Sequence, residues 1–240
     1  MKAFLLAGGL GERLRPLTDR IPKCLAPING VPLLAIWLEL CERYLVSEVL
    51  INVSRHADLV ESFLRERAWN VDIRLIREAN PMGNAGTVLA QRDFVATEES
   101  FFILYTDNLT DVALDRLAAF HATHDAPLTI GLFRTPTPSA SGLVQVRGDG
   151  LVTAFEEKPA SPVGNLANAG VYVARQSLFD LIPKNSSIVD FGRDVFPRLI
   201  NRMYAKPIEE FLLDIGSPEA LTLGSRLWAE RQNALGKLRD

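Results

Sequence analysis

Cysteine is scarce in this sequence: its 240 residues include two, Cys24 and Cys41. They lack the paired spacing of a metal site, which argues against a zinc centre and a disulfide scaffold and fits a reducing cytoplasm. Long apolar runs are also missing, since none approaches the roughly 20 residues of a membrane span. Positive charge is not in excess, because 26 Lys and Arg face 29 Asp and Glu for a net charge of −3. We therefore expect neither a membrane nor a nucleic acid as a partner.

Apolar segments of strand length alternate with segments of helical periodicity up to about residue 135. Strands are predicted at Lys2–Ala7, Val49–Val53, Val71–Ile76, Phe101–Tyr105 and Leu128–Phe133, and helices at Pro32–Leu45, Ala57–Arg67 and Leu114–His124. This order predicts a mainly parallel sheet with helices on both faces. Such sheets bind ligands beyond the carboxyl ends of their strands, so the loops after Ala7, Ile76 and Tyr105 are the expected place for a site.

The remaining sequence is more irregular, with a proline-rich loop at Thr135–Gly142 followed by short elements. Strands are predicted at Leu143–Arg147, Val152–Phe155, Ala169–Ala174 and Phe211–Ile215, and helices near Ser177–Ile182 and Gly192–Asn201. Ser217 is expected to cap a last helix. Because no repeat, low-complexity tract or long linker interrupts the chain, we expect a single domain over residues 1–240.

The most informative segment follows the first predicted strand and combines glycines with cations, at Gly8, Gly9, Gly11, Arg13, Arg15 and Lys23. Glycines let backbone N–H groups approach a polyphosphate, and Arg and Lys supply positive charge to its oxygens. A P-loop is excluded because Glu-Arg follows Gly11 where Lys-Ser/Thr is required. A dinucleotide-binding fingerprint fails because Leu14 replaces its third glycine and Asn52 stands in a strand end without the expected acid. A tight turn without a ligand is disfavoured by the number of cations.

Six segments in a fixed order carry a family resemblance: residues 7–18 with 21–23, Arg77–Gly86, Thr106–Leu109, Phe155–Pro159, Asn168–Gly170 and Asp214–Pro218. Together they resemble the signature of the sugar-phosphate nucleotidyltransferases, which join a nucleoside triphosphate to a sugar 1-phosphate and release pyrophosphate. The resemblance extends along nearly the whole chain. It implies a Rossmann-like, three-layer α/β/α fold with a mainly parallel mixed sheet. It also implies a nucleotide-binding half at residues 1–135 and a sugar-phosphate-binding half at residues 136–240.

The resemblance further implies roles for individual residues. The implied catalytic residues are Arg13, Lys23 and Asp107. The implied nucleotide-binding residues are Leu6, Ala7, Gly8, Gly9, Gly11, Glu12, Arg13, Lys23, Glu78, Pro81, Gly83 and Asn84. The implied sugar-phosphate-binding residues are Gly142, Glu157, Lys158 and Asn168, and the implied Mg²⁺ ligands are Asp107 and Asp214.

Chemistry supports the charged assignments. Negative charge builds up as pyrophosphate leaves, so Arg13 and Lys23 would stabilise the transition state. Mg²⁺ is a hard cation that is held by one or two carboxylates together with substrate phosphates. Without the resemblance, Asp107 and Asp214 also fit the common use of aspartate in turns and caps. A sugar phosphate is already an anionic nucleophile and needs no general base, so the three histidines, His56, His121 and His124, are expected to be solvated on the surface.

The sugar half and the nucleobase loop are assigned by resemblance. Glu157 would accept hydrogen bonds from sugar hydroxyls, Lys158 would contact the sugar's phosphate, and Asn168 can both donate and accept. An exposed charged strand end is the alternative for Glu157 and Lys158. Gly83 is expected to let its loop approach the nucleobase, with Asn84 as a simple helix cap as the alternative.

Three positions depart from the family pattern: Thr106 replaces a common glycine, and Glu12 and Asn84 each replace a common threonine. The segments 105–111 and 190–197 and the Asp-Ile-Gly ending look most like guanylyltransferases that act on mannose 1-phosphate or manno-heptose 1-phosphate. Uridylyl or thymidylyl transfer to another hexose 1-phosphate is an alternative. So is a regulatory subunit that binds nucleotide sugars without turnover. The sequence leaves open whether the chain forms a homo-oligomer.

Overall fold

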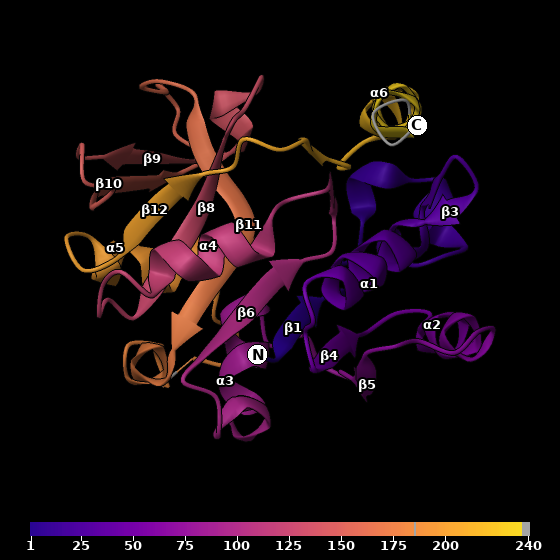
Figure 1. Cartoon of the computed structure of the whole chain (residues 1–240), viewed down its shortest axis with the longest axis horizontal. Coiled ribbons are helices and arrows are strands. Elements are labelled where there is room, and N and C mark those ends of the chain that lie inside the picture. The colour runs from indigo at the N-terminus through magenta and orange to yellow at the C-terminus, as the bar shows by residue number, and fades with distance from the viewer. Residues whose placement is uncertain (185, 237–240) are drawn as a thin grey trace.

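A computed structural model of the chain describes residues 1–184 and 186–236. Its centre is a nine-stranded sheet (Figure 1). One part of the sheet is parallel, in the order β6 (Ser100–Tyr105), β1 (Ala3–Leu6), β4 (Glu48–Val53) and β5 (Asp72–Arg77). These strands lie where the apolar segments predicted them, within one residue at each end.

Helices cover both faces of the parallel strands. Successive side chains of β1 point to opposite faces of the sheet, so they contribute to two different cores. Ala3 and Leu5 belong to a core shared with α1 (Leu33–Arg43), α2 (Ala57–Arg65) and α4 (Leu114–His121). Phe4 belongs to a second core, which includes side chains of α3 (Asn84–Ala90) and of α5 (Phe196–Leu199). This arrangement confirms the predicted α/β class with helices on both faces of a mixed sheet.

The second half of the chain adds mostly antiparallel strands to the same sheet. β11 (Leu166–Arg175) pairs antiparallel with β6 and with β8 (Leu128–Arg134), and it meets the hairpin of β9 (Gly142–Val146) and β10 (Val152–Glu157). β12 (Tyr204–Pro207) joins β8 in parallel. Because β6 pairs with β11, strands from before and after residue 135 form one continuous layer.

Short elements surround this layer, and several were not predicted. β2 (Pro27–Ile28) and β3 (Val31–Pro32) form a hairpin, and β7 (Asn108–Thr110) pairs with β13 (Leu212–Asp214). Single 3₁₀ turns occur at Glu12–Leu14, Leu17–Asp19, Lys23–Leu25, Arg92–Val95, Pro138–Ala140 and Gln176–Asp180, the last in place of the helix predicted near Ser177–Ile182. The helix predicted at Gly192–Asn201 is a π-helical turn over Phe191–Val195 that leads into α5.

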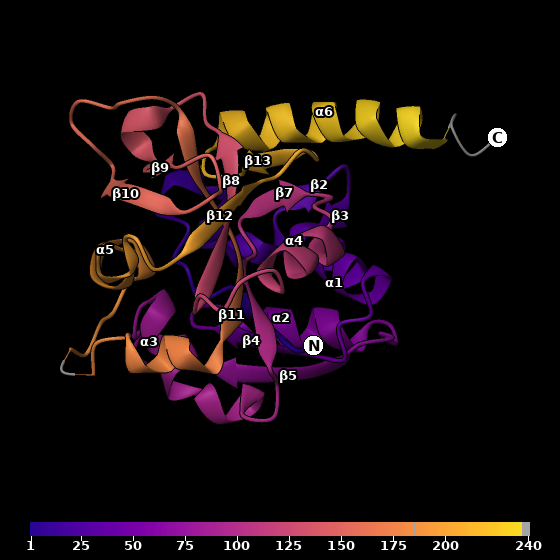
Figure 2. The same cartoon turned by 60° about the vertical axis from the view of Figure 1, so that its left-hand side comes forward.

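The C-terminal helix α6 (Pro218–Gly236) begins as predicted, since the Ala220 N–H donates to Ser217 Oγ at 3.2 Å. Figure 2 shows this helix extending past the sheet at one end of the molecule. Within the described residues, no helix combines the length and apolarity that crossing a membrane requires.

The histidine prediction is wrong for His121, which is 1% exposed. Its Nδ1 lies 2.8 Å from Thr129 Oγ1, and His124 Nε2 lies 3.0 Å from the same hydroxyl. The Ala126 N–H donates to His124 Nδ1, so His124 Nε2 carries a proton for Thr129, and the Thr129 hydroxyl donates to His121. Burial, reinforced by Arg175 and His124, lowers the pKa of His121 to about 3.

This burial makes the stability of the fold depend on pH. The unfolded state binds a proton on His121 near pH 6.5 whereas the folded state does not, so the free energy of unfolding falls as the pH drops below that value. Between about pH 6 and pH 4 we expect the wild type to lose about 1.4 kcal/mol per pH unit more than His121→Asn, which keeps a partner for Thr129. Urea unfolding of both proteins across this range measures the difference. Parallel pH profiles would show that His121 is not held neutral.

Candidate active site

The site forms at the edge of the sheet where the neighbouring parallel strands β1 and β6 end. From there the chain after β1 continues to β4 on one side of this pair, and the chain after β6 continues to β8 on the other side. Leu6 and Tyr105 are register partners at the carboxyl ends of β1 and β6. The Thr106 backbone N–H and its hydroxyl both donate to the Leu6 carbonyl oxygen, at 3.2 and 3.0 Å. The hydroxyl that distinguishes Thr106 from glycine therefore ties the two strand ends together. This is the crevice in which ligands of open α/β sheets bind.

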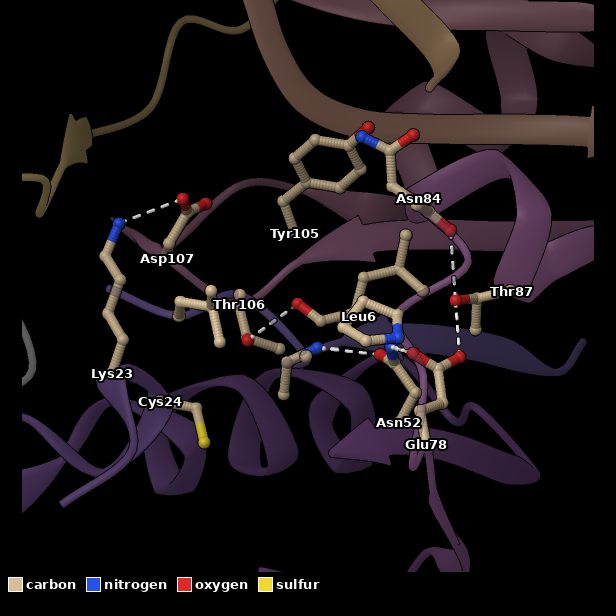
Figure 3. A pocket seen from close by; sticks show the side chains of 16 residues that line it. Leu6, Lys23, Cys24, Asn52, Glu78, Asn84, Thr87, Tyr105, Thr106 and Asp107 are labelled. Carbon is tan, nitrogen blue, oxygen red and sulfur yellow. Dashed lines mark hydrogen bonds and ion pairs between the residues drawn. The ribbon is translucent and has the colours of Figure 1, made fainter. Parts of the chain in front are cut away.

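A cavity of about 360 Å³ opens at this crevice (Figure 3). Its lining includes most of the residues predicted to bind the nucleotide, together with Asp107: Leu6, Ala7, Gly8, Gly9, Lys23, Glu78, Pro81, Gly83 and Asn84. Gly11, Glu12 and Arg13 lie outside the lining. Six further residues, not assigned from the sequence, complete it: Leu10, Cys24, Asn52, Thr87, Tyr105 and Thr106.

Polar side chains on one side of this cavity form a connected network. Asn52 Oδ1 accepts from the Ala7 N–H at 2.9 Å, and Asn52 Nδ2 donates to Glu78 Oε2 at 3.1 Å. The Thr87 hydroxyl donates to Glu78 Oε1 at 2.5 Å and lies 3.1 Å from the Gly83 carbonyl. Figure 3 shows the three side chains converging from β4, from the end of β5 and from α3.

The opposite side of the site carries the predicted charged residues. Lys23 Nζ lies 2.9 Å from Asp107 Oδ2 and 3.7 Å from Asp214 Oδ1, and Arg13 Nη2 lies 3.8 Å from Asp214 Oδ2. The strand pair β7–β13 brings the aspartates together, because Asp214 is the partner of Asn108 and the Ile215 N–H donates to the Asp107 carbonyl at 3.0 Å. The structure therefore groups the four charged residues that the sequence placed far apart.

This group contains two carboxylates that repel each other and two cations that attract them. The pKa of Asp214 is raised by partial burial and by the negative charge of Asp107, while Lys23 and Arg13 counteract the rise. Asp214 Oδ1 is buried and accepts no hydrogen bond within the described part of the chain. An orphaned carboxylate oxygen beside a second carboxylate fits a hard divalent cation. Within residues 1–184 and 186–236, no group of three or more His, Cys, Asp or Glu could enclose a metal alone. In proteins, Mg²⁺ is commonly held by one or two carboxylates together with substrate phosphates.

The residues predicted for the sugar phosphate lie outside the cavity lining. Glu157 Oε2 faces two glycines, since a Cβ on Gly142 or Gly192 would lie 2.7 or 2.6 Å from it. The pKa of Glu157 is raised because the surrounding chain desolvates its carboxyl, an effect that Lys158 opposes and Asp190 reinforces. Lys158 Nζ lies 3.9 Å from Glu157 Oε1. A carboxylate beside an ammonium group can contact a hydroxylated, anionic ligand.

Asn168 is engaged within the protein. Its Oδ1 accepts from the Gly170 N–H at 3.0 Å, and its Nδ2 donates to the Tyr172 hydroxyl at 2.9 Å. These bonds span the irregularity at which the pairing of β11 with β8 shifts between Asn168 and Tyr172. The observed contacts of Asn168 are therefore structural, with one amide hydrogen and spare acceptor capacity left for a ligand.

The loop at residues 81–86 is held by the chain segment at 188–191. Gly83 has a φ of 77°, and a Cβ there would lie 2.4 Å from the Val189 carbonyl oxygen, which explains why only glycine fits. Asn84 Nδ2 donates to Asp190 Oδ2 at 2.6 Å, and Asn84 Oδ1 accepts from the Phe191 N–H at 2.7 Å. The close approach seen at Gly83 is to Val189. Asn84 links two loops and is not the simple helix cap considered as the alternative.

Comparison with known proteins finds one matching family profile and several relatives of similar sequence. A family profile described as Nucleotidyl transferase matches residues 2–230. A mannose-1-phosphate guanyltransferase of Schizosaccharomyces pombe is 33% identical over 95% of this chain and 64% of its own length. A mannose-1-phosphate guanylyltransferase catalytic subunit beta of Danio rerio is 32% identical over 100% of this chain and 68% of its own length. The chain thus spans about two thirds of the length of these relatives.

Solved structures share the fold at low sequence identity. A structure from Bacillus anthracis, provisionally assigned as a glucose-1-phosphate thymidylyltransferase, superposes with a TM-score of 0.84 at 19% identity, over 95% of this chain and 94% of the other. HddC from Yersinia pseudotuberculosis, in complex with GMP-PN, gives a TM-score of 0.78 at 22% identity, over 95% of this chain and 99% of the other. The profile match over most of the sequence and the identity to the curated relatives lead to one conclusion: the chain belongs to the nucleotidyl transferase family.

Proposed function

We propose that the protein joins a nucleoside triphosphate to a sugar 1-phosphate and releases pyrophosphate, with GTP and mannose 1-phosphate or manno-heptose 1-phosphate as substrates. The observation that carries the proposal is the meeting of Arg13 and Lys23 with Asp107 and Asp214 beside a cavity at the carboxyl ends of β1 and β6. The names of the curated relatives support the choice of guanosine and mannose.

In the proposed reaction, a phosphate oxygen of the sugar 1-phosphate attacks the α-phosphorus of the triphosphate. A new P–O bond forms while the bond to the β-phosphate oxygen breaks, and pyrophosphate carries away the electron pair. Lys23 is held at the site by its contact with Asp107 and would neutralise phosphate oxygens as charge builds up, with Arg13 beside Asp214 assisting. Asp107 and Asp214 would hold Mg²⁺, which supplies Lewis-acid stabilisation of the phosphate oxygens.

The two halves of the chain divide the substrates in this proposal. Residues 1–135 provide the cavity for the nucleotide, and residues 136–240 provide Glu157 for sugar hydroxyls and Lys158 for the sugar's phosphate. Support for one domain comes from the sheet, since β6 of the first half pairs directly with β11 of the second.

Both cysteines, Cys24 and Cys41, are free and buried, with burial raising the pKa of each to about 12. They support a cytoplasmic location, where thiols stay reduced.

The substrate proposal is tested by a matrix of triphosphates and sugar phosphates. GTP, ATP, UTP and dTTP are each paired with the 1-phosphates of mannose, manno-heptose, glucose, galactose and N-acetylglucosamine, and pyrophosphate release is measured. We expect release with GTP and mannose or manno-heptose 1-phosphate. Turnover with UTP or dTTP alone would reject guanosine but keep the reaction. Binding of nucleotide sugars without any release would instead indicate a regulatory subunit.

Asp107→Asn tests the role of the aspartates. The amide keeps the shape of the side chain but removes the charge that a divalent cation and Lys23 require. We expect kcat to fall on the order of a hundredfold or more, with the melting temperature unchanged within a few degrees, because the amide oxygen can still accept from Lys23 and the Asp214 carboxylate still offsets its charge. Asp93→Asn, at a fully exposed acid, is the matched control and should retain full turnover. An Asp107→Asn protein with near-normal kcat would refute the assignment.

A further inference from the structure

The network around Asn52 has a fixed direction. Its Oδ1 accepts from the Ala7 N–H, which can only donate, so its Nδ2 must point to Glu78 Oε2. Exchanging the two ends of the amide would place N–H groups against the Ala7 N–H and an oxygen against the carboxylate. Asn52 is 4% exposed, so water does not compensate for such a mismatch. Asn52 is therefore an obligatory donor to Glu78.

The second oxygen of Glu78 is held in the same way. The Thr87 hydroxyl donates to Oε1, and Thr87 is itself buried. The Glu78 backbone N–H donates to the Val53 carbonyl at 2.7 Å, which anchors the start of the side chain to the end of β4. Each carboxylate oxygen thus accepts one hydrogen bond from the protein, and two donors on opposite sides set the plane of the group. A carboxylate accepts hydrogen bonds and does not donate them.

We infer that Asn52 and Thr87 are positioning residues that present Glu78 to the nucleobase as an oriented group which only accepts hydrogen bonds. This inference rests on the proposed nucleotide-binding role of Glu78, which lines the cavity. Guanine carries adjacent N1–H and N2–H₂ donors and can satisfy such a group. Uracil presents its single N3–H between two carbonyl oxygens, which a fixed carboxylate repels. The geometry thereby selects guanine over uracil and thymine.

Asn52 also connects base recognition to the phosphate loop. The amide that orients Glu78 is bonded to Ala7, the residue that leads from β1 into the glycines. A displacement of Asn52 would change the distance between the base-reading carboxylate and the backbone N–H groups of that loop. One buried side chain thus contacts both the residue before the phosphate loop and the carboxylate proposed to read the base.

Five variants separate positioning from packing, with dissociation constants for GTP and UTP measured by calorimetry. Asn52→Asp is isosteric and keeps an acceptor for Ala7, but it turns a like charge toward Glu78. We expect it to reduce the preference for GTP over UTP at least tenfold, and more than the apolar Asn52→Leu does. Thr87→Val should reduce the preference severalfold, and Thr87→Ser, which keeps the hydroxyl, should restore it. Ser54→Ala removes a hydroxyl bonded to Gly8 and should leave the preference at the wild-type value.

The results divide clearly. Weaker GTP and UTP binding by the same factor in Asn52→Asp and Thr87→Val would overturn the inference, as would an Asn52→Asp preference equal to the wild type. If the Asn52 variants melt far below the wild type, the pair Thr87→Val and Thr87→Ser decides. A wild type that prefers GTP in binding but releases no pyrophosphate would refute the proposed reaction and leave this inference standing. A wild type that binds neither GTP nor UTP would refute both.

Discussion

The contact of the Lys23 ammonium group with two carboxylates is the interaction on which the site depends. Asp107, directly before β7, and Asp214, in β13, are far apart in the sequence, and their charges repel when these strands pair. Lys23 offsets this repulsion from the loop after β1 and is itself mostly buried, with its side chain 12% exposed. Burying an ammonium group requires paired charges, so the cation and the two acids depend on one another for their positions.

The sheet supplies the geometry that makes this contact feasible. β1 lies between β4 and β6, so the loop after β1 and the loop after β6 leave neighbouring strands at the same edge. Thr106 joins the two strand ends through the Leu6 carbonyl, and Trp37 Nε1 donates to the Asn108 carbonyl at 2.8 Å and so fixes β7 to α1. These hydrogen bonds set the position of the backbone around Asp107, and the contact with Lys23 then holds its carboxylate.

The sequence predicted the parts of this molecule that local patterns determine. Apolar runs located the parallel strands, and the glycine-and-cation loop located half of the charged site. The pairing of β7 with β13 was not predictable, because three-residue strands have no periodicity of their own and their partners are distant. The sequence interpretation of Asn52 covers only the missing acid, although one polar residue in an apolar strand indicates a buried polar contact. His121 was misjudged for a clearer reason: it follows Leu114 by seven positions and Leu117 by four, which places it on the buried face of its helix.

Two loops on opposite sides of the residue 135 boundary are joined by bonds rather than by packing alone. Val189 accepts from the Ala85 and Gly86 N–H groups, and Asn84 bridges to Asp190 and Phe191. Gly192, directly after this segment, lies against Glu157, the carboxylate proposed for the sugar. The segment at residues 188–192 therefore contacts the loop at residues 81–86 on one side and the Glu157 carboxylate on the other, and so links elements from both sides of residue 135.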